Sequence, residues 1–279
     1  MKRILVPVDF TELSDYAVNL AAELSEKLNY NITFIHAVHV SGEVLLDDNG
    51  NLIPSGEFDP SGLDMELNNA TAKLMAISNS VGNGSKHIAR FGSTEKVILN
   101  ELNGTNYDLV VMATHGATGV KGHLLGSHAE VIAMRSPVPV LSIKSAEKLL
   151  KNVVFASSFN SPFRLPEPVI SILKELNAEI TFLTVVKSEN PANEEEIISR
   201  INKSAKLSDI DNFQVVLQVS DDVESGIESY CKENNVGILI FESKGKTGFK
   251  KWVTGCVSAD LVNHYDHALL TFTNRMLEN

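Results

Sequence analysis

Apolar residues fall into two kinds of segment along the first half of the chain, and the two kinds alternate. Short runs rich in β-branched residues have the length of buried strands, and they lie at 4–8, 32–38, 88–91, 109–113 and 138–143. Longer segments carry apolar residues three or four positions apart, as amphipathic helices do, and they lie at about 14–28, 63–77, 94–102 and 127–134. Strands that alternate with helices predict a parallel sheet, flanked by helices and joined by right-handed crossovers.

The second half of the chain repeats the pattern of the first. The aligned segments are 153–159 with 4–10 (offset 149), 180–186 with 32–38 (offset 148), and Gly245 and Gly255 with Gly116 and Gly126 (offset 129). The first half therefore has 19 extra residues, and the Gly- and Pro-rich segment 41–62 has the composition of a loop that could hold them. We expect two similar domains, 1–145 and 151–279, packed about a pseudo-two-fold axis as a homodimer would be. Whether whole chains also form a homodimer stays open.

A glycine-rich stretch follows the apolar run at 109–113. Four glycines lie within eleven residues, at Gly116, Gly119, Gly122 and Gly126. Glycine lets the backbone approach an anion closely, and the unpaired N–H groups at a helix start attract it. The stretch therefore fits a phosphate site, with Ser127 as a hydroxyl donor at the start of the next helix. Taken alone, a plain connecting loop explains the glycines equally well.

Composition and charge narrow the class of protein. The chain has 279 residues, of which 43% are hydrophobic, and its formal net charge is −11. This charge argues against nucleic acid and against an acidic membrane surface as partners, and the apolar residues are too dispersed for a membrane span. Cys231 and Cys256 match no metal-ligand spacing, and reduced thiols are typical of the cytoplasm. No export signal is seen before the first strand, so we expect a soluble cytoplasmic protein.

These features together resemble the universal stress protein family in its tandem, two-domain form, over nearly the whole chain. The nucleotide motif of that family is Gly, two residues, Gly, nine residues, Gly and then Ser or Thr. Gly116, Gly126 and Ser127 fit the motif, whereas Ala113 stands at its first glycine. The strand end that carries Asp9 and the sequence His-Ala-Val at 36–38 are also similar to the family.

The resemblance implies two Rossmann-like domains of the adenine nucleotide alpha hydrolase type. Each has a five-stranded parallel sheet of order 3-2-1-4-5 flanked by helices. Ligands of such sheets bind at the carboxyl ends of strands one and four, where the strand order reverses. Asp9 and the glycine loop are expected at those two ends.

The resemblance also implies roles for several site residues, with ATP or a related adenine nucleotide as the ligand. Asp9 accepts a hydrogen bond from the exocyclic amine of adenine, and Ala37 and Ala113 lie near the base and the ribose. The glycine loop and Ser127 hold the phosphates, with a divalent cation such as Mg²⁺ or Mn²⁺. The expected site consists of Pro7, Val8, Asp9, Ala37, Ala113, Thr114, Gly116, Gly119, Gly126, Ser127 and His128.

The second half departs from the motif. Ser158 stands at the position of Asp9, Glu242 at that of Ala113, and Cys256 at that of Ser127. Glu242 would place a negative charge beside the phosphates, which is a like-charge clash. We therefore expect the first domain to bind nucleotide and the second, degenerate site not to bind it.

The leading interpretation is a nucleotide-dependent module of stress response and signalling. Two alternatives stay open: a scaffold with vestigial pockets that acts through its surface, and a slow ATP hydrolase, since bound phosphates need only a metal and a positioned water. No residue is assigned as catalytic or as a metal ligand. His36, at the end of the second expected strand, is interpreted as a packed histidine rather than a metal ligand.

Overall fold

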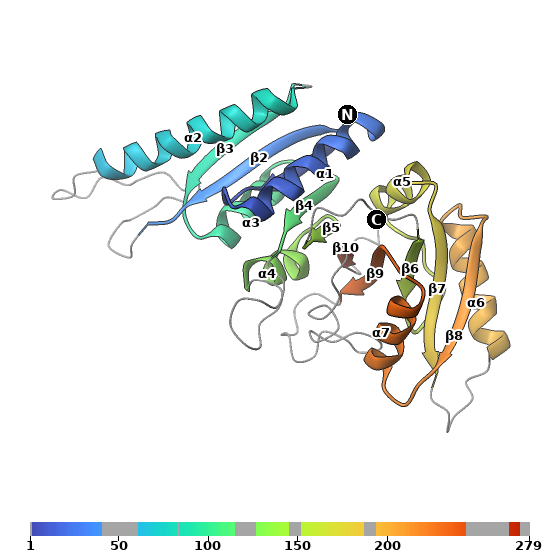
Figure 1. Cartoon of the computed structure of the whole chain (residues 1–279). Helices are drawn as coiled ribbons and strands as arrows, with labels where there is room; N and C mark the ends of the chain where they lie inside the picture. Colours follow the sequence, from blue (N-terminus) through green and yellow to red (C-terminus); the bar gives the residue numbers. More distant parts are fainter. Residues whose placement is uncertain are drawn as a thin grey trace. The chain divides into compact units, whose positions relative to one another are not determined.

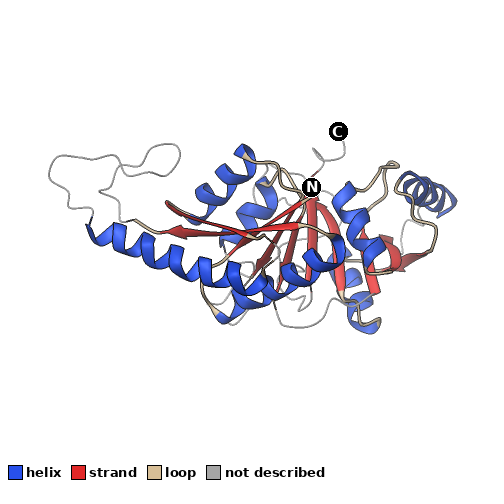
Figure 2. Cartoon of the chain, turned by 90° about the horizontal axis from the view of Figure 1, so that it is seen from above, coloured by secondary structure: helices blue, strands red, loops and turns tan. Residues whose placement is uncertain are grey.

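The computed structural model describes residues 2–40, 61–82, 84–114, 127–144, 152–186, 194–243 and 268–273. The chain forms two compact units, 1–113 and 114–279. Figure 1 labels the helices and strands along the chain, and Figure 2 shows the strands in red and the helices in blue. The expected domain boundary at 145–151 falls on residues outside the described part of the chain, so the limits 1–145 and 151–279 stay predictions.

In its described residues the first unit has a parallel sheet with three helices. Its strands are β1 (Arg3–Pro7), β2 (Asn31–Val38), β3 (Lys86–Phe91) and β4 (Leu109–Ala113), and they lie side by side in the order β3-β2-β1-β4. Its helices are α1 (Glu12–Leu28), α2 (Ser61–Val81) and α3 (Thr94–Gly104). α2 lies along β3 and β2 (Figure 1), whereas α1 contacts β1 and β4.

The described residues of the second unit form six strands in the order β5-β10-β9-β6-β7-β8. The strands are β5 (Val140–Ile143), β6 (Asn152–Ala156), β7 (Glu179–Val186), β8 (Phe213–Val219), β9 (Ile238–Ser243) and β10 (Ala268–Thr273). The helices are α4 (Ser127–Arg135), α5 (Glu167–Glu175), α6 (Glu194–Leu207) and α7 (Val223–Glu233). The strands from β10 to β8 are all parallel, and β5 pairs with β10 in the antiparallel direction.

The strand orders confirm the predicted α/β fold. The second half has the order β8-β7-β6-β9-β10, which is the expected 3-2-1-4-5, and the strands of the first unit follow the same order from β3 to β4. Apolar runs become strands here because a central parallel strand is covered on both faces. Every residue of β5 and β10 is buried, whereas the outermost strands β3 and β8 consist mainly of half-buried and exposed residues.

Backbone features of the first half recur in the second at the offset found in the sequence. The amide of Val8 donates to the Ile35 carbonyl at 2.9 Å, and the amide of Ser157 donates to the Leu183 carbonyl at 3.1 Å. Left-handed backbone occurs at Phe10 (φ 61°) and Phe159 (φ 45°), and again at Asn29 (φ 53°) and Asn177 (φ 47°). Asn29 is the C-cap of α1, a position where Asn tolerates this conformation.

The two halves differ most in the residues that follow their first strand. α1 begins two residues after Phe10, whereas α5 begins eight residues after Phe159. Pro162 and Pro166 explain the late start, because a proline disfavours helical backbone at the residue before it. α6 holds the non-helical segment 160–166: the amide of Phe163 donates to Ser204 Oγ at 3.2 Å, and that of Leu165 donates to Ser208 Oγ at 2.9 Å. The two buried serines thus accept hydrogen bonds from backbone amides that would be paired with carbonyl groups in a helix.

Candidate functional site

The reversal of strand order in the first unit lies at β1. The chain runs from β1 to its neighbour β2 and on to β3, and then returns to β4 on the other side of β1. Ile4 and Leu5 are level with Leu109 and Val110, and the same register continued brings Val8 level with Ala113. The carboxyl ends of β1 and β4 therefore meet at one edge of the sheet, where ligands of open α/β sheets bind.

Asp9 is held in a turn at this edge. Phe10, the next residue, has a left-handed backbone with φ of 61°. Oδ1 of Asp9 accepts hydrogen bonds from the amide of Thr11 at 3.0 Å and from its hydroxyl at 2.6 Å. Thr11 is also the N-cap of α1, and its hydroxyl accepts from the Ser14 amide at 3.4 Å. The exposed carboxylate thus lies at a helix N-terminus, where the helix dipole favours a negative charge.

His36 and Phe10 pack together beside the turn. Nδ1 of His36 lies 2.6 Å from the carbonyl oxygen of Val8, and the His36 and Phe10 ring centroids are 4.4 Å apart. Nζ of Lys73, from α2, lies 5.1 Å from the centroid of the Phe10 ring. The half-buried His36 agrees with its interpretation as a packed histidine, while the contact of Phe10 with Lys73 was not predicted. No sequence pattern indicates that a phenylalanine will adopt a left-handed backbone, so this contact had no usable signal.

The end of β4 carries two of the expected site residues. Ala113 is half-buried, and it is not among the non-glycine residues of the described chain that have a positive φ. An alanine at the first glycine of the motif is therefore free of left-handed strain here. Thr114 follows it and is 3% exposed, and its amide donates to the Ile143 carbonyl at 2.8 Å. Its Oγ1 has no hydrogen-bond partner among the described residues, which is costly for a buried hydroxyl.

The other expected site residues are described only in part. Val8 is buried, and Pro7 and Ala37 are half-buried, with Asp9 and Ala37 at the carboxyl ends of neighbouring strands. Ser127 begins α4, and the side chain of His128 on the same helix is exposed. Three residues of the glycine loop, Gly116, Gly119 and Gly126, lie outside the described residues.

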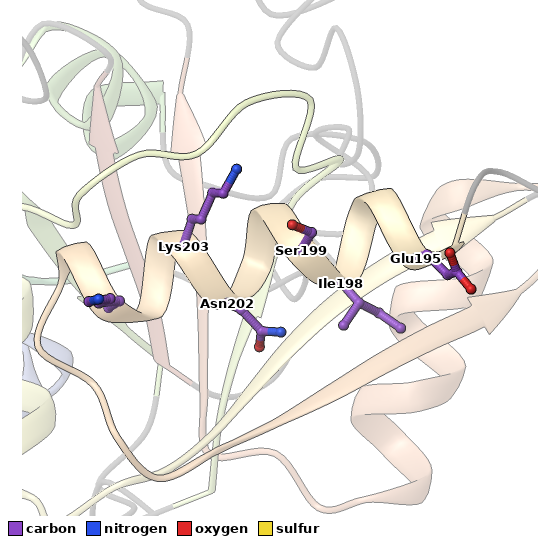
Figure 3. Close-up of a pocket in the computed structure, with 6 residues that line it drawn as sticks. Glu195, Ile198, Ser199, Asn202 and Lys203 are labelled. Carbon is purple, nitrogen blue, oxygen red and sulfur yellow. The ribbon is translucent and has the colours of Figure 1, made fainter.

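Other kinds of site find no support in the described part of the chain. Within it, no group of three or more His, Cys, Asp or Glu side chains could hold a metal ion, and no helix is long and apolar enough to cross a membrane. Figure 3 shows an open pocket on one face of α6. It is lined by Glu195, Ile198, Ser199, Asn202, Lys203 and Lys206. A single helix face cannot enclose a ligand, and none of the expected site residues lies there.

A parallel sheet that reverses its strand order beside a fixed carboxylate defines a Rossmann-like α/β protein with a candidate ligand site at the reversal. Residues 1–144 match the model of the universal stress protein family. The match covers more than half of the chain, and the chain therefore belongs to this family.

Individual relatives agree with this membership. Universal stress protein MJ0531 of Methanocaldococcus jannaschii is 29% identical over 147 residues, which cover 53% of this chain and 84% of that protein. Universal stress protein MJ0577 of the same organism is 26% identical over 153 residues, covering 51% of this chain and 94% of that protein. A solved universal stress protein from Archaeoglobus fulgidus DSM 4304 has a TM-score of 0.69 at 16% identity, and the alignment covers 97% of this chain and 96% of that one. This last likeness shows the fold over both halves.

Proposed function

We propose that the first half of the chain binds ATP or a related adenine nucleotide at the carboxyl edge of β1 and β4, as part of a nucleotide-dependent stress response. The observation that carries the proposal is the Asp9 turn, which holds an exposed carboxylate at the reversal of strand order. A carboxylate accepts hydrogen bonds and fits the exocyclic amine of adenine. Membership of the universal stress protein family supports the same assignment.

The remaining roles in this proposal are those that the resemblance to the family implies. Ala37, Pro7 and Val8 would line the base, and Ala113 would lie near the ribose. Thr114 directly follows Ala113, and its buried hydroxyl without a described partner could serve a ligand. The phosphates would be held by residues of the loop and of the start of α4, which are Gly116, Gly119, Gly126, Ser127 and His128. A bound Mg²⁺ or Mn²⁺ would neutralise phosphate charge.

We also propose that the chain is a tandem of two such domains, with binding confined to the first. The recurring left-handed residues Phe10 and Phe159 support the repeat, and so does the antiparallel pairing of β5 with β10, the last strand of each proposed domain. In the second half Ser158 replaces the acid, and Arg200 Nη1 donates to the Phe159 carbonyl at 3.2 Å. The turn of the second half that corresponds to the Asp9 turn is therefore hydrogen-bonded to α6.

The test is isothermal titration of the purified chain with ATP and Mg²⁺. We expect one site per chain, weaker binding in Asp9→Ala, and unchanged binding in the matched control Ser158→Ala. Two equivalent sites would contradict the confinement to the first half. No binding by the native chain, and no nucleotide in the protein as purified, would favour a scaffold that acts through its surface. Turnover of ATP that disappears in Ser127→Ala would instead favour a slow hydrolase.

A further inference from the structure

The imidazole of His36 contacts the residues on both sides of Asp9. Its Nδ1 lies 2.6 Å from the carbonyl oxygen of Val8, and a carbonyl oxygen can only accept, so Nδ1 carries the hydrogen and donates it. Its ring lies against the ring of Phe10 at a centroid distance of 4.4 Å and an angle of 38°. One side chain from β2 therefore touches the backbone before the acid and the side chain after it.

Phe10 needs such support, because its backbone is unfavourable for a side chain with a Cβ atom. Its φ of 61° lies in the left-handed region, which costs free energy for a bulky residue such as phenylalanine. The Phe10 ring packs against the buried cluster of Val38, Ala70 and Phe91, beneath α2. Contact with His36 and burial against this cluster offset the strain of the turn.

We propose that His36 is a positioning residue for Asp9, which means that it sets the direction of the carboxylate toward the base without touching the ligand. The inference rests on the proposed nucleotide site. His36 fixes the Val8 carbonyl through its hydrogen bond and the Phe10 side chain through ring packing, so the intervening residue has little freedom. The hydrogen bonds from Thr11 then fix the carboxylate itself.

The second half of the chain lacks this arrangement. Thr184 stands at the position of His36, and Ser158 at that of Asp9. Phe159 keeps the left-handed backbone, but the residue is 1% exposed, and its ring centroid lies 5.6 Å from that of Phe155 and 5.8 Å from that of Phe182. The ring therefore belongs to the core of the second unit. The imidazole occurs in the half that has a carboxylate to position.

Two substitutions separate the contacts of His36. In His36→Asn the side-chain amide nitrogen lies as many bonds from Cα as Nδ1 does, so the donor to Val8 is kept and the ring is lost. In His36→Phe the ring is kept and the donor is lost. The control is His39→Asn, since His39 is an exposed histidine just beyond β2. A third variant, Phe10→Asn, removes the Phe10 ring and keeps a residue that tolerates the left-handed backbone. Urea unfolding of each variant shows whether the fold is kept.

The measured quantity is the ratio of the dissociation constants for ATP and ITP, because inosine carries a carbonyl where adenine carries the amine. We expect the native chain to prefer ATP, and each His36 variant to bind ATP about three- to tenfold more weakly, the effect of losing one ordered hydrogen bond. Binding of ITP should change little. In the Asp9→Ala background His36→Phe should have no further effect, since the two residues act as one unit.

An unchanged ATP-to-ITP ratio in folded His36→Asn, His36→Phe and Phe10→Asn would overturn the inference while the proposed function stands. Equal weakening of ATP and ITP would also overturn it, since that result indicates a general structural role. If the native chain binds neither nucleotide, the proposed function falls and the inference falls with it. If the native chain binds ATP but Asp9→Ala leaves the ATP-to-ITP ratio unchanged, Asp9 does not contact the base, and the inference is overturned while nucleotide binding stands.

Discussion

The hydroxyl of Thr11 donates a 2.6 Å hydrogen bond to the same Asp9 oxygen that accepts from the Thr11 amide at 3.0 Å. Thr11 is also the residue that caps α1. The turn that carries the candidate ligand contact and the start of the first helix are therefore one structural unit. A change at Thr11 must affect both.

Thr11→Ala should lower the free energy of unfolding by about 1 kcal/mol, as is typical for the loss of an N-cap. The same variant should weaken binding of adenine nucleotide, because the Asp9 carboxylate loses a hydrogen bond that orients it. Urea unfolding and isothermal titration measure the two effects. Thr11→Ser keeps the hydroxyl and should behave like the native chain in both, so a defect in Thr11→Ser would contradict this account.

Tyr107 should make the stability of the protein depend on alkaline pH. Burial raises the pKa of Tyr107 to about 12, and the hydroxyl donates to Glu101 Oε1 at 2.9 Å. Because the folded state favours the protonated phenol, its contribution is fully present below the unfolded pKa of 10 and is lost as pH rises to about 12.

Urea unfolding at several pH values between neutrality and pH 11 checks this prediction for Tyr107. Tyr107→Phe should remove the Tyr107 part of the pH dependence and should cost about 1 kcal/mol at neutral pH, since the Glu101 carboxylate loses a donor. Tyr16→Phe, at a half-buried position on α1, is the control and should keep the alkaline loss of stability.

Gly226 lets α7 approach β7 closely, and a larger residue should not be tolerated there. A Cβ atom at this position would lie 2.9 Å from Cβ of Ser220 and 3.0 Å from Cγ1 of Val185. Gly226→Ala should therefore lower the free energy of unfolding by about 1–3 kcal/mol, as overpacking does. Gly104→Ala is the matched control, because no atom lies within 4 Å of its added Cβ. An unchanged thermal midpoint in Gly226→Ala would show that the helix can move away.

Loss of the Ser204 hydroxyl should destabilise the protein more than loss of a hydroxyl on the exposed face of α6. Its Oγ accepts from the amide of Phe163 at 3.2 Å, and the residue is 1% exposed. Ser204→Ala leaves that amide without its acceptor, which should cost about 1–3 kcal/mol in urea unfolding. Ser199→Ala lies on the open face of the same helix (Figure 3) and should have little effect. Similar midpoints for the two variants would mean that the segment 160–166 is held in another way.

The local pattern of the chain predicted the strands of the first half and the place of Asp9 after the first of them. The run at 4–8 is apolar because β1 is covered on both faces, and Asp9 follows it because the carboxyl end of a parallel strand opens to solvent. The sequence repeat also aligns Phe159 with Phe10, and both residues have the same left-handed backbone conformation. The glycine loop, in contrast, stays a prediction, since it lies outside the described residues.

Contacts between residues distant in the chain determined the features that the sequence pattern did not predict. The hydrogen bond of His36 to Val8 and the ring contact with Phe10 join β2 to the turn after β1, and no local pattern encodes them. Ser204 and Ser208 accept hydrogen bonds from a proline-containing segment some 40 residues earlier in the chain, and these contacts hold the non-helical backbone that the prolines favour before α5. The hydrophobic periodicity of a helix or strand indicates which of its faces is buried. Which residues pack against that face, and whether they can offset backbone strain, depends on the tertiary structure.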